Sequence, residues 1–163
     1  MTTAICPGSF DPITLGHLDI IRRASRIFDT VVVCIMVNAA KSRHMFSDEE
    51  RAEMVRLAVA DLPNVRVDVW DGLLTSYAQK CENPVIVKGL RAASDFEYEL
   101  QMNNVNKNLF PELETMFLTA DSRYTFLSSS IVRELAGYGA DISSLVPPEI
   151  IEKIETKIKQ GRT

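Results

Sequence analysis

The sequence has no long hydrophobic run. Its longest uncharged apolar stretch, Val31 to Val37, is far shorter than the roughly 20 residues that a membrane-spanning helix needs. The first residues also lack the basic-then-apolar order of a secretory signal peptide. We therefore expect a cytoplasmic protein that has no membrane partner.

Cysteine is scarce, and no pair of cysteines is spaced for chemistry. Cys6, Cys34 and Cys81 are odd in number and far apart, and they form no Cys-x-x-Cys motif that could hold zinc or a redox disulfide. We expect three reduced thiols that behave as small apolar side chains.

An excess of positive charge is also missing. The 18 Lys and Arg residues are outnumbered by 22 Asp and Glu residues, which gives a formal net charge of -4. A negative molecule repels nucleic-acid backbones, so we expect no nucleic-acid partner. Any phosphate ligand must be held by a local cluster of donors, which favours a small anionic substrate in a pocket.

The 163 residues contain no Ser- or Gly-rich linker, so we expect one domain over residues 1–163. Short β-branched runs alternate with segments of helical periodicity. The expected strands, most of them apolar enough to be buried on both faces, are Thr3–Cys6, Thr30–Val37, Val65–Trp70, Val85–Lys88 and Thr115–Leu118.

Helix signals lie between and beyond these strands. One apolar stripe at helical spacing consists of Leu18, Ile21, Ala24 and Phe28. Capping-box spacing occurs at Ser47 with Glu50 and at Ser94 with Glu97. A helix should begin near Ser129, and a C-terminal helix near residues 147–160 carries Ile150, Ile154 and Ile158 on one face.

This alternation predicts an α/β fold: a Rossmann-like, doubly wound sheet of about five parallel strands, with helices on both faces. Ligands of such sheets bind outside the carboxyl ends of the strands, where the strand order reverses. We therefore expect the site in the segments that directly follow strands.

The first such segment runs from Pro7 to His17 and contains two prolines and two glycines. Gly8 and Gly16 let a ligand approach the backbone closely. His17 would lie at a helix N-terminus, where free amides favour a bound phosphate and the macrodipole disfavours a cation. The alternative is a tight strand-to-helix turn in which His17 is a surface or capped residue.

Thr14-x-Gly16-His17 after this loop resembles the T/HxGH motif of the nucleotidylyltransferase superfamily. A second motif of that superfamily is similar to Phe126-Leu127-Ser128-Ser129-Ser130-Ile131-Val132-Arg133. Serines at a helix start can supply hydroxyls and amides to phosphate oxygens, although one or two of them also make an ordinary N-cap. The two motifs together favour nucleotide binding.

Two other glycine patterns are not nucleotide motifs. Gly137-x-Gly139 follows a predicted helix instead of a strand and lacks a third glycine, so we interpret it as a helix stop. The segment from Gly8 to Gly16 has no Gly-Lys-Ser/Thr ending, which excludes a Walker-type loop.

The stretch from Lys88 to Ala92, followed by Asp95 to Glu99, resembles the bacterial phosphopantetheine adenylyltransferase family, and the resemblance extends over nearly the whole chain. It implies ATP-binding roles for Ser9, Phe10, His17, Gly89, Leu90, Arg91, Glu99, Tyr124, Thr125, Phe126, Leu127, Ser128, Ser129 and Ser130. It implies acceptor-binding roles for Ser9, Lys41, Leu74 and Lys88, and catalytic roles for His17, Lys41 and Arg91.

Several of these roles have ordinary alternatives. Many relatives have arginine at the position of Lys88, so here the positive charge is kept but the bidentate fork is lost. Glu99 would share a helix face with Asn103 and Asn106, and alone it could be a solvated charge. Lys41 could be a plain surface lysine, and we expect His44 to be a surface residue.

The resemblance implies that the acceptor's phosphate attacks the α-phosphorus of ATP and releases pyrophosphate. A phosphate dianion needs no general base, which fits a sequence without a Ser-His-Asp triad pattern or a metal-ligand cluster. We expect Mg²⁺ to accompany ATP through phosphate oxygens and water. The substrates would be ATP and 4′-phosphopantetheine, in a homohexamer by resemblance. The alternatives are a sister nucleotidyltransferase, acting on nicotinamide mononucleotide or on glycerol phosphate with CTP, and a non-catalytic nucleotide-sensing module.

Overall fold

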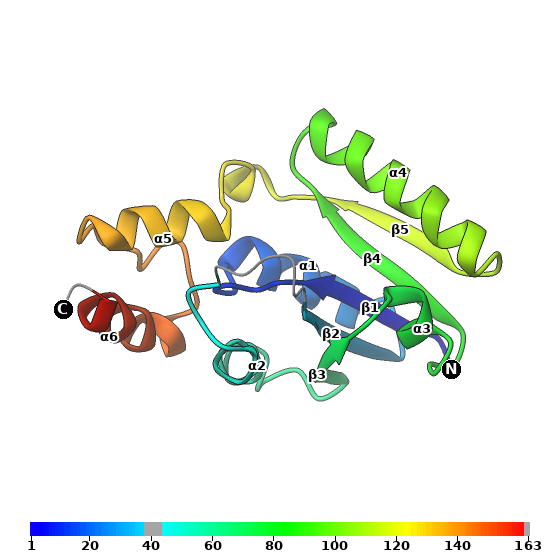
Figure 1. Ribbon diagram of the computed structural model, residues 1–163, viewed down its shortest axis with the longest axis horizontal. Helices are drawn as coiled ribbons and strands as arrows, with labels where there is room; N and C mark the ends of the chain where they lie inside the picture. The colour runs from blue at the N-terminus through cyan, green and yellow to red at the C-terminus, as the bar shows by residue number, and fades with distance from the viewer. Residues whose placement is uncertain (38–43, 162–163) are drawn as a thin grey trace.

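The computed structural model describes residues 1–37 and 44–161, and its five strands form one parallel sheet (Figure 1). The strands are β1 (Thr3–Gly8), β2 (Thr30–Val37), β3 (Val65–Asp71), β4 (Pro84–Leu90) and β5 (Glu114–Thr119). Their order across the sheet is β3-β2-β1-β4-β5, so the order reverses at β1. All four strand pairs are parallel. The predicted doubly wound α/β fold is confirmed.

Helices connect the strands and continue beyond the last one. They are α1 (Leu15–Ser25), α2 (Asp48–Ala58), α3 (Leu74–Ala78), α4 (Ala93–Leu109), α5 (Ser129–Gly137) and α6 (Ile151–Gly161), with short 3₁₀ turns at Ser122–Tyr124 and Pro148–Ile150. None of the helices in residues 1–37 and 44–161 is both long enough and apolar enough to cross a membrane.

The two faces of the sheet bury cores of different size. One face packs Ala4, Val33 and Val87 against α1 and α2, and α5 and α6 extend the same core. The other face packs Ile5, Val32 and Ile86 against the short helix α3. Because side chains alternate along a strand, neighbouring residues of β1 and β2 supply the two cores. Helices therefore cover both faces, as predicted.

The central strands and the edge strands differ in burial. Residues Val31 to Ile35 of β2 are fully buried, whereas β3 and β5 expose about every second side chain. The prediction of strands buried on both faces therefore holds for the middle of the sheet and fails at its edges, where only one neighbour exists.

Helix starts and stops were predicted with mixed success. Ser47 and Glu50 form the predicted capping box of α2, and the predicted helices at Ser129 and after Pro148 are present. The prediction at Ser94 and Glu97 was wrong, because α4 begins at Ala93 and has no side-chain cap. Ser94 lies inside its first turn, and Gly139, with φ +79°, follows α5 as the predicted stop.

The three cysteines are free thiols, as expected. Burial raises the pKa of Cys6 to about 12 and that of Cys34 to about 12, so both remain protonated at neutral pH. A protonated, buried thiol is a poor nucleophile, so we assign no chemistry to either residue.

Candidate active site

The loop from β1 to α1 places His17 in the first turn of α1. Thr14 is the N-cap residue: its Oγ1 accepts the His17 backbone N–H at 3.3 Å, and its own N–H donates to His17 Nδ1 at 3.1 Å. This reciprocal pair is a capping box in which histidine replaces the usual Glu or Gln. The sequence had left open whether His17 was capped, and here the ring itself makes the cap.

The hydrogen bond to Nδ1 determines the state of the His17 ring. Because Nδ1 accepts from Thr14, the ring hydrogen belongs on Nε2, on the side away from Thr14. Burial and the positive charges of Arg91 and Lys88 lower the pKa of His17 to about 4. At neutral pH, His17 is therefore an uncharged imidazole that can donate a hydrogen bond through Nε2.

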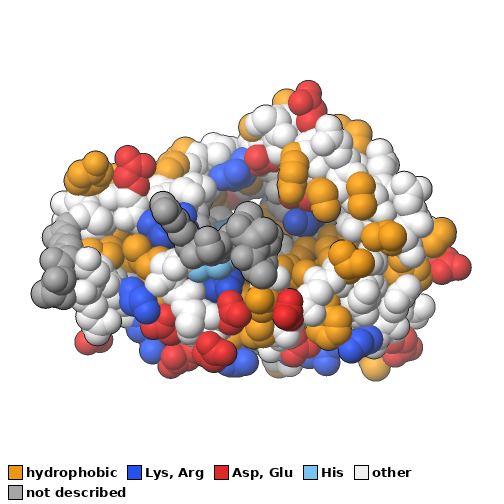
Figure 2. Space-filling model, viewed as in Figure 1, with side chains coloured by type: hydrophobic (Ala, Val, Ile, Leu, Met, Phe, Trp, Pro, Cys, Tyr) orange, Lys and Arg blue, Asp and Glu red, His pale blue; other side chains and the backbone are white. Residues whose placement is uncertain are grey.

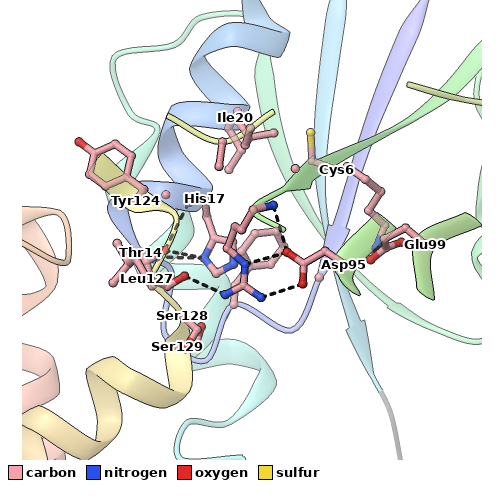
Figure 3. Close-up of a pocket in the computed structure, with 18 of the residues that line it drawn as sticks. Cys6, Thr14, His17, Ile20, Asp95, Glu99, Tyr124, Leu127, Ser128 and Ser129 are labelled. Atoms are coloured by element: carbon pink, nitrogen blue, oxygen red, sulfur yellow. Dashed lines mark hydrogen bonds and ion pairs between the residues drawn. The ribbon is translucent and has the colours of Figure 1, made fainter. Parts of the chain in front are cut away.

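A first cavity of about 470 Å³ opens beside His17, at the carboxyl ends of β1 and β4 (Figure 3). It lies at the point where the strand order reverses, as the fold predicts. The site residues predicted from the sequence that line it are Phe10, His17, Lys88, Gly89, Arg91, Glu99, Tyr124, Leu127, Ser128 and Ser129. Thus β1, β4, α4 and the segment before α5 converge on one hollow.

Arg91 bridges two walls of the first cavity. Its Nε and Nη2 donate to the Asp95 carboxylate at 3.0 and 3.2 Å, and its Nη1 donates to the Leu127 carbonyl at 3.0 Å. The guanidinium lowers the pKa of the Asp95 carboxyl. Nη1 and Nη2 each carry a second hydrogen, so Arg91 is held in place and can still donate to a phosphate.

The three serines at the start of α5 make hydrogen bonds within the protein. Ser128 Oγ accepts the Ile131 N–H as the N-cap, Ser129 Oγ donates to the Pro12 carbonyl at 2.7 Å, and Ser130 Oγ accepts from Arg133. The sequence had suggested hydroxyls and amides as phosphate ligands. Only Ser129 uses its hydroxyl hydrogen in these bonds, whereas Ser128 and Ser130 accept and each keeps a hydrogen that can be donated. The predicted roles of the serine hydroxyls and of the first amides of α5 therefore stay predictions.

A second cavity of about 570 Å³ lies between the loop after β3 and helix α4. Ser9, Leu74 and Lys88, all predicted to bind the acceptor, line it. The predicted polar face of α4 lines it as well, together with the apolar residues Tyr98, Met102, Val105 and Leu109 of that helix. The two cavities share five residues, which are Pro7, Gly8, Lys88, Tyr98 and Glu99. Lys88 Nζ lies 3.4 Å from the Glu99 carboxylate on this shared wall.

Some predicted site residues lie elsewhere. Leu90, Thr125, Phe126 and Ser130 line neither cavity, and Phe126 is 58% exposed. Lys41 lies outside the described residues, so its predicted role stays a prediction.

The prediction that His44 is a surface residue was wrong. Its side chain is only 19% exposed, and its Nδ1 lies 3.4 Å from the Asp11 carboxylate. Asp11 is buried and also accepts the Met45 and Phe46 amides at 3.0 Å each. Asp11 and Asp95 were not predicted as site residues, because an aspartate in a loop or in a first helical turn has no distinctive spacing.

Known proteins resemble this chain over most of its length. Residues 5–135 match the family described as Cytidylyltransferase-like. Phosphopantetheine adenylyltransferase of Dictyoglomus turgidum is 50% identical over 159 residues, covering 98% of this chain and 99% of its own. The enzyme of that name from Caldanaerobacter subterraneus subsp. tengcongensis is 49% identical over 161 residues, covering 99% of this chain and 100% of its own.

A solved structure shares the fold. It is described as a putative nicotinate-nucleotide adenylyltransferase from Vibrio parahaemolyticus, with a TM-score of 0.68 and 19% identity, covering 98% of this chain and 92% of that one. Because the identity is low, this similarity supports the fold and not the function. The full-length relatives carry the assignment: the chain belongs to the phosphopantetheine adenylyltransferase family.

Proposed function

We propose that ATP binds in the first cavity, that 4′-phosphopantetheine binds in the second, and that the two react where the cavities share lining residues. As a phosphopantetheine adenylyltransferase, it transfers the adenylyl group of ATP to the phosphate of 4′-phosphopantetheine, which gives dephospho-CoA and pyrophosphate. The single observation that carries the placement of the substrates is that Lys88 and Glu99 line both cavities. Two substrates that react with each other must meet at such a wall.

The first cavity is the proposed ATP site. It combines the N-terminal ends of α1 and α5 with Arg91 and the Nε2–H of His17, which suits a polyphosphate. In an in-line attack on the α-phosphorus, negative charge develops on the transferring and leaving groups. A neutral donor such as His17 and the cation Arg91 can stabilise that charge without removing a proton from the nucleophile.

The second cavity is the proposed acceptor site. Ser9 and Lys88 line it, with Lys88 on the wall shared with the first cavity, and so do apolar side chains of α4 together with Asn103 and Asn106. A phosphate beside Lys88 and a long amide-bearing arm along α4 match these lining residues. Leu74, at the start of α3, also lines this cavity. We assign Lys41 to the acceptor phosphate by family resemblance.

Mg²⁺ is the proposed companion of ATP. Within residues 1–37 and 44–161 there is no group of three His, Cys, Asp or Glu side chains that could hold a metal ion. The carboxylates lining the first cavity, Asp95 and Glu99, are paired with Arg91 and Lys88. Mg²⁺ would therefore be coordinated mainly by phosphate oxygens and water, as it prefers. Its charge would offset that of the pyrophosphate leaving group.

The cytoplasm is the proposed compartment, because all three cysteines are free thiols. A homohexamer is the proposed assembly, by family resemblance. An observation in its favour is that α4 has no buried residue although it carries Tyr98, Leu100, Met102, Val105 and Leu109. Figure 2 shows hydrophobic side chains gathered over the surface formed by α4. Such an exposed apolar surface is typical of a subunit contact.

The reverse reaction tests this proposal directly. Dephospho-CoA and labelled pyrophosphate, supplied with Mg²⁺, should give labelled ATP and free 4′-phosphopantetheine. The His17→Ala variant serves as the matched control, since it should bind dephospho-CoA but exchange label far more slowly. Absence of labelled ATP with the wild-type protein would contradict the proposed function.

A further inference from the structure

One buried arginine lines neither cavity but donates a hydrogen bond to the loop between β1 and α1. Arg51 lies on α2, its side chain is fully buried, and it lines neither cavity. Its Nη1 donates to the Ser9 carbonyl at 2.5 Å, and its Nη2 donates to the Asp48 carboxylate. Its Nε has no hydrogen-bond partner in the described parts of the chain. Burying a guanidinium costs desolvation free energy, which suggests that Arg51 has a function that offsets this cost.

The Ser9 carbonyl is one of three in the β1–α1 loop that side chains from other helices hold. Arg133 of α5 donates to the Asp11 carbonyl, and Ser129 of α5 donates to the Pro12 carbonyl at 2.7 Å. Donors from α2 and α5 therefore fix the loop. Of these, only Arg51 reaches the part of the loop where the two cavities meet, since Ser9 lines the second cavity and Phe10 lines the first.

The Ser9–Phe10 peptide is the group that Arg51 orients. Among the described residues the only cis peptide joins Asp11 to Pro12, so the Ser9–Phe10 peptide is trans. In a trans peptide the C=O and the N–H point in opposite directions. With the Ser9 carbonyl turned toward Arg51, the Phe10 N–H is turned away from Arg51.

The backbone conformation of Phe10 indicates that contacts with the rest of the protein restrain this loop. Phe10 has φ +48°, in the left-handed region that bulky residues rarely adopt. Its ring packs at 5.2 Å, edge to face, against the ring of His17. A residue kept in an unfavourable conformation beside a functional group is over-determined by its surroundings.

We propose that Arg51 is a positioning residue for adenylyl transfer. It holds the Ser9–Phe10 peptide so that the Phe10 amide faces the phosphates of ATP and the Phe10 ring supports His17. The inference rests on the proposed placement of ATP in the first cavity. A positioning role predicts a loss in the rate of the chemical step, whereas a merely structural role predicts a loss of stability alone.

The test compares two substitutions of Arg51 with one control on the same helix. Arg51→Met keeps the length of the side chain without donors, and the partly exposed Asp48 can then be hydrated. Arg51→Lys keeps the charge but offers a point donor instead of a fork. Met54→Ala removes a side chain that is equally buried on α2 but belongs to the core and lines neither cavity. The measurements are kcat, both KM values, the Kd for α,β-methylene-ATP, and Tm.

We expect Arg51→Met to lower kcat about 100-fold, as a misplaced reacting group does, with the KM for phosphopantetheine within about threefold of wild type. Its Kd for α,β-methylene-ATP should rise. Arg51→Lys should recover part of the lost rate. Met54→Ala should lower Tm and keep kcat within about twofold of wild type.

Three results would overturn the inference: an unchanged kcat in Arg51→Met, equal losses of kcat in Arg51→Met and Met54→Ala, or an Arg51→Lys variant that folds but recovers nothing. If Arg51→Met fails to fold, Arg51→Lys carries the comparison. Failure of the proposed function looks different, because wild type itself would then be inactive. The Kd for α,β-methylene-ATP would in that case still report whether Arg51 orders the loop.

Discussion

At the scale of single residues, His17 caps a helix and, in the proposed function, also donates a hydrogen bond to the reacting phosphates. Nδ1 closes the first turn of α1 by accepting from Thr14, which directs the hydrogen of the ring to Nε2. Burial of the ring, with the positive charges of Arg91 and Lys88, lowers its pKa and keeps it neutral. The residue is therefore a fixed, uncharged donor instead of a proton carrier.

This assignment predicts the order of activity in two variants. His17→Ala should lower kcat about 10²- to 10³-fold, which is the usual cost of removing one donor to the transition state. His17→Gln, whose amide can still donate toward the first cavity, should retain more activity. Steady-state kinetics with both substrates saturating would check this order. Equal rates for wild type and His17→Ala would remove His17 from the mechanism.

The lowered pKa of His17 also predicts a pH dependence of stability. The ring takes up a proton near pH 6.5 in the unfolded chain but only near pH 4 in the folded protein. Between these values the unfolded state binds more protons, so acidification favours unfolding. We expect the free energy of unfolding of wild type to fall relative to His17→Gln as the pH drops from 6.5 to 4, measured by urea titration. A constant difference over that range would mean that the folded ring titrates normally.

At the scale of elements, the contact between β4 and α1 leaves no room for a side chain at Gly89. A Cβ built there would lie 2.9 Å from Ile20 Cγ1. Gly89→Ala should therefore destabilise the protein by about 1 to 3 kcal/mol, the usual cost of overpacking. Adding Ile20→Ala should recover part of that loss in a double-mutant cycle.

The control for this cycle is Gly137→Ala, since a Cβ at Gly137 would meet nothing within 4 Å. Thermal unfolding of the four proteins of the cycle and of the control would measure these effects. Additive effects of Gly89→Ala and Ile20→Ala would contradict the predicted clash.

The elements that the sequence predicted well are those with a periodic or compositional pattern. The apolar run of β2 was predicted with its observed bounds, because a central strand buries both faces. The capping box of Ser47 and Glu50 was also predicted, because its two residues are three positions apart and can be recognised in the sequence. Ser94 with Glu97 has the same spacing, but Asp95 pairs with Arg91 there and the helix begins earlier.

The site was predictable where family motifs mark it and unpredictable where long-range contacts make it. In the sequence, Arg51 cannot be distinguished from other helical arginines, because its contact with Ser9 joins residues 42 positions apart. His44 appeared to be a surface residue for the same reason, because its partner Asp11 is distant in sequence. Spacing within one element cannot reveal such pairs.

At the scale of the whole molecule, the exposed apolar side chains of α4 predict self-association. Val105 lies in the second half of this 17-residue helix and is 49% exposed. Val105→Glu should shift the protein to a smaller species, because a charge opposes burial in a contact. Light scattering after gel filtration would measure the mass. Leu57→Glu, at an apolar position on α2 that is 38% exposed, is the control that should keep the wild-type mass. A monomeric wild type, or an unchanged mass for Val105→Glu, would contradict the proposed contact.

The most direct test of the central claim is the choice of acceptor. The purified protein is incubated with Mg-ATP and, separately, with 4′-phosphopantetheine, nicotinamide mononucleotide and glycerol 3-phosphate, and pyrophosphate release is measured together with the product mass. We expect pyrophosphate only with 4′-phosphopantetheine, and a product with the mass of dephospho-CoA. An adenylylated product with nicotinamide mononucleotide, or ATP binding without turnover on any acceptor, would contradict the account.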